Sequence, residues 1–387
     1  MSVDQQFNYF MPTRVRFGWG ELDRIGEAVA GLGTKALLVT GRSAMQKLGF
    51  TDLVVNALQT VDIETVIYNK VEPNPSVTTV DEGAALAKEL GCDFVIGLGG
   101  GSPLDAAKAI AAVMAAGGSV WELIKGERAV PPVVPLVAVP STAGTGSEVT
   151  QYALVSNKDA QEKFPLRSPY LFPTVAIVDP AVMATQTPEL TAETGMDALT
   201  HAIEAMVGNS ATPLGDLFAA EAIRYIARHI VTAVRQGDDR EARAGMAYGS
   251  MLAGVAIAQA GTGAAHGIGQ AVGGIFDTGH GATVGILLPH VMEFNLTTRM
   301  AKYAYIARLL GAKVDGLNEE QTARAGVDYV HKLLADVGLP SGLDGLGVSK
   351  EAREEIVIAA RPQGGIRNNP RRMEDEDVRK LLNAVLA

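Results

Sequence analysis

The sequence predicts two domains: an α/β domain with a doubly wound, mostly parallel sheet, followed by an all-helical domain. In the first half, short apolar runs alternate with helix-length segments, a pattern typical of parallel βαβ units with helices on both faces. After Asp179-Pro180, long helical patterns rich in Ala, Leu, Ile and Met replace this alternation. A chain of 387 residues also exceeds what one hydrophobic core ordinarily supports. We place the domains at residues 1–183 and 184–387.

The first half contains four apolar runs with the length of buried strands, and three helical patterns lie between them. The runs are residues 35–40, 64–68, 93–96 and 134–139. The helices are expected at about 43–59, 80–90 and 103–116. Two further tracts, 148–155 and 174–178, have strand-like composition, and we expect the second to close the sheet.

The second half is predicted to be helical, with patterns at 197–207, 213–235 and 240–258 and several more toward the C-terminus. Thr187-Pro188-Glu189 is a good helix start, because Thr is a preferred N-cap and Pro fits the first helical position. The glycine-rich stretch 261–285 has Ala, Ile, Val and Phe between its glycines. This composition indicates close-packed helix that is interrupted where another group must approach, rather than a flexible linker.

Composition restricts the classes of partner and the compartment. The net charge of −10 argues against nucleic acid or an anionic membrane as the main partner. Cys92 is the only cysteine, which excludes an intrachain disulfide and favours a reducing compartment. We recognise no signal peptide and no apolar run of bilayer length. We therefore expect a soluble, cytoplasmic protein.

Four residues of the helical half form a candidate metal site. Asp197 and His201 are four residues apart, so that on a helix both side chains lie on one face. His266 and His280 are flanked by glycines, which allow close approach. One carboxylate and three imidazoles suit a divalent first-row transition metal better than Mg²⁺ or Ca²⁺. A purely structural metal is disfavoured, because structural sites are usually rich in thiolates and closed.

Two glycine-containing loops that follow predicted strands are candidate phosphate-binding elements. The segment 99–105, Gly-Gly-Gly-Ser-Pro-Leu-Asp, opens a helix with Ser102 as N-cap and Pro103 at the first helical position, so backbone N–H groups lie at the positive end of the helix dipole. It is neither a Walker A loop nor the G-x-G-x-x-G fingerprint. The loop 140–148 follows the next strand and offers four hydroxyls. Two such loops at neighbouring strand ends form a nucleotide crevice.

Taken together, these motifs resemble the iron-containing (group III) alcohol dehydrogenase family over nearly the whole chain. The segments that carry the resemblance are 99–105, 140–149, 175–180, 195–204, 263–270, 280–281, 289–295 and 369–371. The resemblance implies a Rossmann-like N-terminal domain and an all-helical C-terminal domain, with metal and cofactor in the cleft between them. It implies reversible hydride transfer between NAD(P)(H) and a small primary alcohol, diol or aldehyde, with the metal as Lewis acid on the alcohol oxygen. It also implies a homodimer or higher homo-oligomer.

The resemblance assigns roles residue by residue. Asp197, His201, His266 and His280 match the family's iron ligands, so they are the expected catalytic residues through Fe²⁺, with Zn²⁺ as a substitute metal. The residues that match cofactor contacts are Asn74, Gly100, Gly101, Ser102, Asp105, Thr142, Thr145, Ser147 and Lys163. Glu204 and His290 fall in family-like segments, where we expect hydrogen-bonded structural roles. His229 and His331 lie on amphipathic helical patterns and are expected at the surface.

Two departures from the family's pattern bear on function. Many relatives have a histidine near the substrate where this chain has Gln270, which cannot titrate. NAD-dependent members typically place an Asp after the first strand, where it binds the adenosine ribose, and this chain has Gly41, Arg42 and Ser43 instead. Losing a carboxylate and gaining a cation and a hydroxyl favours a 2′-phosphate. We therefore expect NADP(H) to be preferred and NAD(H) to remain usable.

Two other functional classes stay open. A metal- and NAD-dependent lyase or cyclase of the dehydroquinate synthase type would use a related fold, but the Asp/His₃ pattern and the lack of a dense basic substrate pocket argue against it. A non-catalytic nucleotide-binding regulatory protein would not explain an intact metal site. Incubation with metal, NAD(P)H and short aldehydes separates the three classes.

Overall fold

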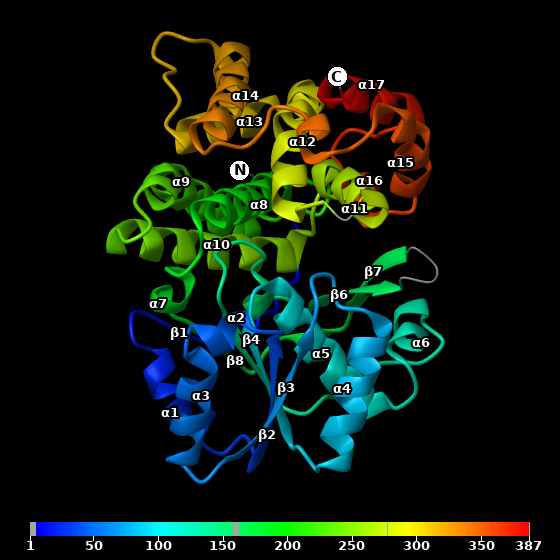
Figure 1. The fold of residues 1–387 in the computed structure, drawn as a ribbon. Coiled ribbons are helices and arrows are strands. Elements are labelled where there is room, and N and C mark those ends of the chain that lie inside the picture. The colour runs from blue at the N-terminus through cyan, green and yellow to red at the C-terminus, as the bar shows by residue number, and fades with distance from the viewer. Residues whose placement is uncertain (1–4, 158–161, 277, 387) are drawn as a thin grey trace. The chain divides into compact units, whose positions relative to one another are not determined.

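The computed structural model describes residues 5–157, 162–276 and 278–386. The described chain forms two compact units (Figure 1). The α/β unit consists of Met11–Thr142 and Gly146–Thr185. The helical unit contains the rest of the described chain, including the short loop Ala143–Thr145. None of the helices in these described segments is long and apolar enough to cross a membrane.

A six-stranded parallel sheet forms the centre of the α/β unit, with the strand order β1-β8-β5-β4-β2-β3. Its strands are β1 (Arg14–Phe17), β2 (Lys35–Gly41), β3 (Glu64–Val71), β4 (Phe94–Gly99), β5 (Leu136–Pro140) and β8 (Val175–Val178). The predicted fold class, a parallel sheet domain joined to a helical domain, is confirmed.

Helices cover both faces of this sheet (Figure 1). One face carries α1 (Ile25–Val29), α2 (Ala44–Lys47) and α3 (Phe50–Gln59), and the other carries α4 (Val77–Glu89), α5 (Gly101–Ala116) and α6 (Val120–Lys125). Successive residues of β2 point to opposite cores, because Leu37 and Val39 pack with α4 and α5 whereas Leu38 packs with α3. Strands buried on both faces explain why the apolar runs are continuous rather than alternating.

Two strand predictions need correction. The tract 174–178 does not close the sheet, because β8 pairs with both β5 and β1 and the edge strand is β1. The apolar pattern does not predict β1 (Arg-Val-Arg-Phe), because a short, partly exposed edge strand is not a continuous apolar run. The tract 148–155 begins as a 3-10 turn, and only β6 (Tyr152–Asn157) is a strand, which pairs antiparallel with β7 (Glu162–Arg167) in a separate two-stranded sheet.

The order of strands places a topological switch point at the carboxyl ends of β2 and β4. From β2 the chain moves outward to β3, and then returns to the other side of β2 through β4, β5 and β8. The loops that follow β2 and β4 therefore diverge. Open α/β sheets bind their ligands at such a point.

The start of α5 differs from the prediction. The helix begins at Gly101 with Gly100 as the N-cap, two residues before the predicted Pro103. Ser102 does not act as the N-cap, and its Oγ instead accepts a hydrogen bond from the Asn74 N–H at 3.2 Å. Since the N-cap is a glycine, the cap residue has no side chain to bind the N–H groups of the first turn, which suits them to an anion.

The helical unit is built from helices. They are α8 (Pro188–Val207), α9 (Pro213–Arg235), α10 (Arg240–Ala260), α11 (Ala264–Phe276), α12 (His280–Asn295), α13 (Met300–Leu310), α14 (Glu319–Asp336), α15 (Arg353–Ala360), α16 (Gly364–Asn368) and α17 (Asp375–Val385). The predicted N-cap is confirmed, because the Thr187 side chain accepts a hydrogen bond from the Leu190 N–H at 3.2 Å. The described part of the stretch 261–285 contains α11 and the beginning of α12, as its composition predicts.

Helix α8 is the central helix of this unit. It packs against α9, α10 and α12, and every residue from Gly195 to Val207 is buried. A helix that is buried all round should be apolar all round. This helix nevertheless carries three buried ionisable residues, and such groups require partners.

Candidate metal centre and nucleotide loops

The three ionisable residues of α8 share one face of the helix, because they stand at positions i, i+4 and i+7. Asp197, His201 and Glu204 are only 3%, 5% and 2% exposed. Helix α11 adds His266, which is 2% exposed. Two helices that are far apart in sequence thus bring four titratable groups into one buried cluster.

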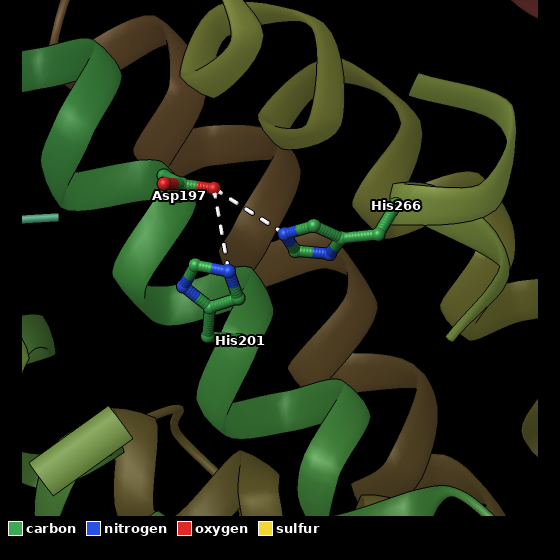
Figure 2. A group of neighbouring side chains, drawn as sticks. All are labelled: Asp197, His201 and His266. Carbon is green, nitrogen blue, oxygen red and sulfur yellow. Dashed lines mark ion pairs between the residues drawn. The ribbon is translucent and has the colours of Figure 1, made fainter. Parts of the chain in front are cut away.

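Asp197 Oδ1 is the common neighbour of the three predicted histidine ligands. It lies 3.4 Å from His266 Nε2 and 3.8 Å from His201 Nε2, as Figure 2 shows for these side chains. His280 Nε2, at the start of α12, lies 3.8 Å from the same oxygen. The ligand atoms of Asp197, His201 and His266 all lie within 4.8 Å of one another. His280 stands at the edge of this group, with its side chain 32% exposed.

These residues fit a divalent metal ion. In a tetrahedral site with bonds of about 2.1 Å, neighbouring ligand atoms are about 3.4 Å apart, close to the separations between Asp197 Oδ1 and the imidazole nitrogens. Asp197 Oδ1 and His266 Nε2 are buried and have no hydrogen-bond partner among the described residues. Buried polar atoms are seldom left unpaired, so a cation bound between them would account for both.

Three side chains of the cluster have shifted pKa values, which set their charges before a metal ion binds. Burial opposes a charge on Asp197, but the histidine rings, His201 foremost, hold the pKa of this carboxyl well below its usual range. Burial lowers the pKa of His201 to about 4, so its imidazole is neutral at pH 7. Burial also opposes a charge on His266, but Glu204 and Asp197 together raise its pKa to about 9. A bound metal ion would replace that proton on His266.

Glu204 has the hydrogen-bonded role that the sequence predicts, but its partner was not foreseen. Its Oε2 accepts hydrogen bonds from His266 Nδ1 at 2.7 Å and from the Gly263 N–H at 2.7 Å. Its Oε1 accepts one from the Ala265 N–H at 2.6 Å. The available signal was its position seven residues after Asp197 on the same helix face.

The remaining histidines are placed outside this cluster. The prediction that His229 lies at the surface is wrong, since it is 7% exposed and fills the space left by Gly245, where a Cβ would lie 2.2 Å from its ring. Helix α9 packs against both α8 and α10, so the side that carries His229 is covered. His331 is exposed as predicted, and its ring centroid lies 5.1 Å from that of His290.

The two predicted phosphate loops begin side by side in the α/β unit. They follow β4 and β5, which pair in parallel with Gly99 opposite Pro140. The Ser141 N–H donates to the Gly99 carbonyl at 2.8 Å. A Cβ on Gly100 would lie 3.3 Å from Thr142 Cγ2, so Thr142 flanks the start of α5.

Asn74, Ser102 and Lys163 are brought together from three different elements. Lys163 Nζ, on β7, donates to Asn74 Oδ1 at 2.6 Å, and the Asn74 N–H donates to Ser102 Oγ. Asn74 has φ 56°, the left-handed region that Asn tolerates better than most residues. These three predicted cofactor residues therefore form one polar group beside the N-terminus of α5.

Asp105 and Ser147 form a hydrogen bond within the α/β unit, whereas Thr145 belongs to the helical unit. Ser147 Oγ donates to Asp105 Oδ1 at 2.6 Å and accepts from the buried Lys108 Nζ at 2.8 Å. Thr145 lies in the loop Ala143–Thr145 of the helical unit, where the Ala143 N–H donates to Gln186 Oε1 at 3.1 Å. The loop 140–148 is thus divided between the two units.

The residues predicted to choose the cofactor lie at the switch point of the sheet. Gly41 is the last residue of β2, and Arg42 and Ser43 follow it with exposed side chains. A Cβ on Gly41 would lie 3.9 Å from Pro103 Cγ, so the end of β2 is next to the start of α5.

Comparisons with known proteins agree with this geometry. Residues 12–180 match the family model "Iron-containing alcohol dehydrogenase", and residues 191–386 match "Fe-containing alcohol dehydrogenase family, C-terminal". The chain is 36% identical over 379 residues to the NAD-dependent methanol dehydrogenase of Bacillus methanolicus, covering 98% of this chain and 100% of the relative. It is 34% identical to the NADPH-dependent butanol dehydrogenase of Clostridium saccharobutylicum, covering 97% of each. A crystal structure of 1,3-propanediol oxidoreductase superposes with a TM-score of 0.95 at 37% identity, covering 99% of this chain and 100% of that chain.

Proposed function

The chain belongs to the iron-containing alcohol dehydrogenase family, and from this premise we propose that it interconverts small primary alcohols or diols and their aldehydes with NADP(H) as the preferred cofactor. At the level of reaction class, the chain is an alcohol dehydrogenase or aldehyde reductase. Relatives named for methanol, butanol and 1,3-propanediol support a short primary alcohol or diol as the substrate.

The observation that carries this proposal is the buried cluster around Asp197. The metal site would consist of Asp197, His201, His266 and His280, the last of which stays partly exposed. The cluster contains no thiolate, whereas structural sites are usually thiolate-rich and closed. An open carboxylate-histidine site suits catalysis, with Fe²⁺ as the metal that the family implies. Zn²⁺ is expected to bind as a substitute, since it stands above Fe²⁺ in the general order of affinity.

The bound groups would supply the reactive chemistry: the metal a Lewis acid for the alcohol oxygen, and the nicotinamide a hydride acceptor or donor. Residues of the chain would hold the metal and the cofactor in place. The N-terminal turn of α5, with Gly100, Gly101 and Ser102, would bind the pyrophosphate, and Thr142 would line its side. Gln270, half-buried on α11, cannot take up a proton, so its side chain would not serve as the acid–base group. The bound cofactor, with a ribose hydroxyl, and water would supply the path for the alcohol proton.

The choice of cofactor rests on the residues after β2. The two relatives described above are named for different cofactors, so their names favour neither. Gly41 leaves no carboxylate to repel a 2′-phosphate, and the exposed Arg42 and Ser43 offer a cation and a hydroxyl. We therefore propose that NADP(H) is preferred and NAD(H) is still used.

A reductase assay tests the proposal. Purified protein is stripped with a chelator and reloaded anaerobically with Fe²⁺, Co²⁺, Zn²⁺ or Mg²⁺. Oxidation of NADPH or NADH is then followed by absorbance with propanal, butanal and lactaldehyde. We expect aldehyde-dependent oxidation with the transition metals but not with Mg²⁺. Nucleotide binding without oxidation under any of these conditions would indicate a regulatory protein and contradict the proposal.

The assembly and compartment of the protein are also proposals. We expect a homodimer or a higher homo-oligomer in the cytoplasm, without nucleic acid or membrane as a partner. Light scattering coupled to gel filtration measures the first point against the chain mass of 40.5 kDa.

A further inference from the structure

We propose that Glu204 is the positioning residue of the metal centre: it sets the tautomer and the place of His266 without binding the metal itself. This inference rests on the proposed metal site. It assigns a role in that site to Glu204 of α8, which is not one of the four candidate ligands. Its basis is the set of three hydrogen bonds that a single buried carboxylate accepts.

The first consequence concerns the ring of His266. Glu204 Oε2 lies 2.7 Å from Nδ1, and a carboxylate can only accept here, so Nδ1 carries the proton. In the neutral ring, Nε2 then keeps its lone pair, and this is the atom that lies 3.4 Å from Asp197 Oδ1. The other neutral tautomer would place a hydrogen on Nε2, which could then not bind a metal.

The second consequence concerns the backbone that carries His266. Gly263 and Ala265 flank the first residue of α11, and their N–H groups are among those that a helix start leaves unpaired. Glu204 of α8 accepts from both of them, at 2.7 and 2.6 Å. Gly263 permits this approach, because a Cβ there would lie 2.9 Å from Glu204 Oε1. One carboxylate therefore holds both the ring and the helix start.

A second helix also confines this helix start. A Cβ on Gly365 would lie 2.1 Å from the Gly263 carbonyl oxygen, and a Cβ on Gly267 would lie 2.9 Å from the Ile366 nitrogen. Helix α16 thus packs against the backbone of α11, and Glu204 of α8 bonds to the same helix start. The segment that carries His266 is therefore held by two other helices, as a preorganised metal ligand requires.

The test is the affinity of the protein for Zn²⁺, measured by competition with a chromophoric chelator, in wild type and Glu204→Gln. A glutamine has one acceptor oxygen where the carboxylate has two, so its NH₂ group must face either the Ala265 N–H or the His266 and Gly263 donors. We expect Zn²⁺ affinity to fall by about 10- to 100-fold, the usual effect of losing such a partner. The visible absorption bands of the Co²⁺ form should also change, because they report the ligand geometry.

Asp216→Asn is the matched control. Asp216 is another buried carboxylate of the helical unit, 4% exposed, and pairs with Lys302 at 3.0 Å. Its replacement removes a buried charge without touching a metal ligand, so Zn²⁺ affinity and the Co²⁺ spectrum should stay as in wild type. An equal loss of affinity in both variants would mean that Glu204 acts only through stability, and would overturn the inference.

A double-mutant cycle shows whether Glu204 acts through His266. In a His266→Ala background, Glu204→Gln should cause no further loss of Zn²⁺ affinity, whereas independent effects would add. Additive losses overturn the inference. If Glu204→Gln does not fold, Gly263→Ala tests the same contact, because its Cβ would displace the carboxylate, and wild-type affinity in that variant would also contradict the inference.

The outcomes separate this inference from the proposed function. If the wild-type protein binds no transition metal, the proposed function itself is contradicted. If the wild-type protein binds metal and reduces aldehydes, but Glu204→Gln has unchanged Zn²⁺ affinity, only the role of Glu204 is contradicted.

Discussion

In the buried cluster around Asp197, neighbouring residues give two histidines opposite pKa shifts. His201 and His266 lie in the same cluster with their ring centroids 4.4 Å apart. Burial lowers the pKa of the first to about 4, while Glu204 and Asp197 outweigh burial and raise that of the second to about 9. The difference follows from the position of Glu204, which bonds to His266.

At this scale, His280→Ala should remove bound metal and turnover while leaving the α/β unit folded. The variant loses a candidate ligand whose Nε2 lies 3.8 Å from Asp197 Oδ1. Metal content is measured by elemental analysis and folding by tryptophan fluorescence, since both tryptophans, Trp19 and Trp121, lie in the α/β unit. The control is His331→Ala, on an exposed histidine, which should keep both metal and activity. Full activity in metal-free His280→Ala protein would exclude the proposed site.

Cofactor preference is the second residue-scale prediction. Arg42→Ala should lower kcat/KM for NADPH by about tenfold or more, as expected for the loss of a charge-assisted bond, and should leave NADH nearly unaffected. Gly41→Asp should shift preference toward NADH, and the substitution fits sterically because nothing lies closer than 3.8 Å to a Cβ there. Kinetics with both cofactors measure the ratio. A wild-type preference for NADH of at least tenfold, together with an Arg42→Ala variant that behaves like wild type, would refute this assignment.

At the scale of elements, the turn from β4 into α5 depends on backbone geometry that only glycine adopts easily. Gly99 has φ 146°, and a Cβ there would lie 2.7 Å from Pro103 Cγ. This conformation directs the chain from the end of the strand into a helix that has Gly100 as its N-cap. The sequence signal, three consecutive glycines, therefore reflects both a sharp turn and a helix start whose cap residue has no side chain.

Gly99→Ala should accordingly destabilise the α/β unit and weaken cofactor binding together. A strained backbone costs about 1–3 kcal/mol, and the contact with Pro103 adds to this. Urea unfolding followed by tryptophan fluorescence and titration with NADPH measure the two effects. Gly91→Ala is the control, because Gly91 also has positive φ, 68°, but has no atom within 4 Å of a Cβ. It should lose stability and retain cofactor affinity, and an equal loss of affinity in both would contradict the prediction.

At the scale of the whole molecule, each unit encloses its own group of buried ionisable residues. In the α/β unit these include Lys108 and Glu148, each 1% exposed. Burial raises the pKa of Glu148 to about 7 and lowers that of Lys108 to about 8, with Asp105 and Glu148 opposing the shift of Lys108. Lys108 Nζ donates to Ser147, Thr150 and the Tyr152 carbonyl, so these groups tie α5 to the loop and strand that follow β5.

This burial predicts a pH-dependent stability. Because the folded pKa of Glu148 lies above its ordinary value of 4.5, its contribution is fully present below that value and is lost as pH rises toward and through about 7. Glu148→Gln stays neutral and should lack this dependence, so wild type should lose up to about 3 kcal/mol relative to the variant between pH 5 and 8. Urea unfolding at four pH values in this range, followed by tryptophan fluorescence, measures the difference. Parallel stability curves for the two proteins would be inconsistent with a buried, titrating Glu148.

The sequence alone determined the features that depend on local pattern. Apolar runs alternating with helical segments predicted the parallel sheet, and Thr187-Pro188 predicted the start of α8, since apolar runs and capping residues are features of the local sequence. The candidate metal ligands were also singled out by the sequence, because Asp197 and His201 stand one turn apart and His266 and His280 lie among glycines. Their meeting at one carboxylate oxygen follows from packing.

Only the tertiary structure decided what depends on contacts between distant segments. The edge strand β1 forms because it can pair with β8, and its own short sequence does not predict a strand. His229 is buried because α10 covers its side of α9. Glu204 bonds to His266 because α8 and α11 pack together, which brings residues 62 positions apart within 2.7 Å. Local pattern specifies a helix face, but the partner of that face is set by the packing of the whole unit.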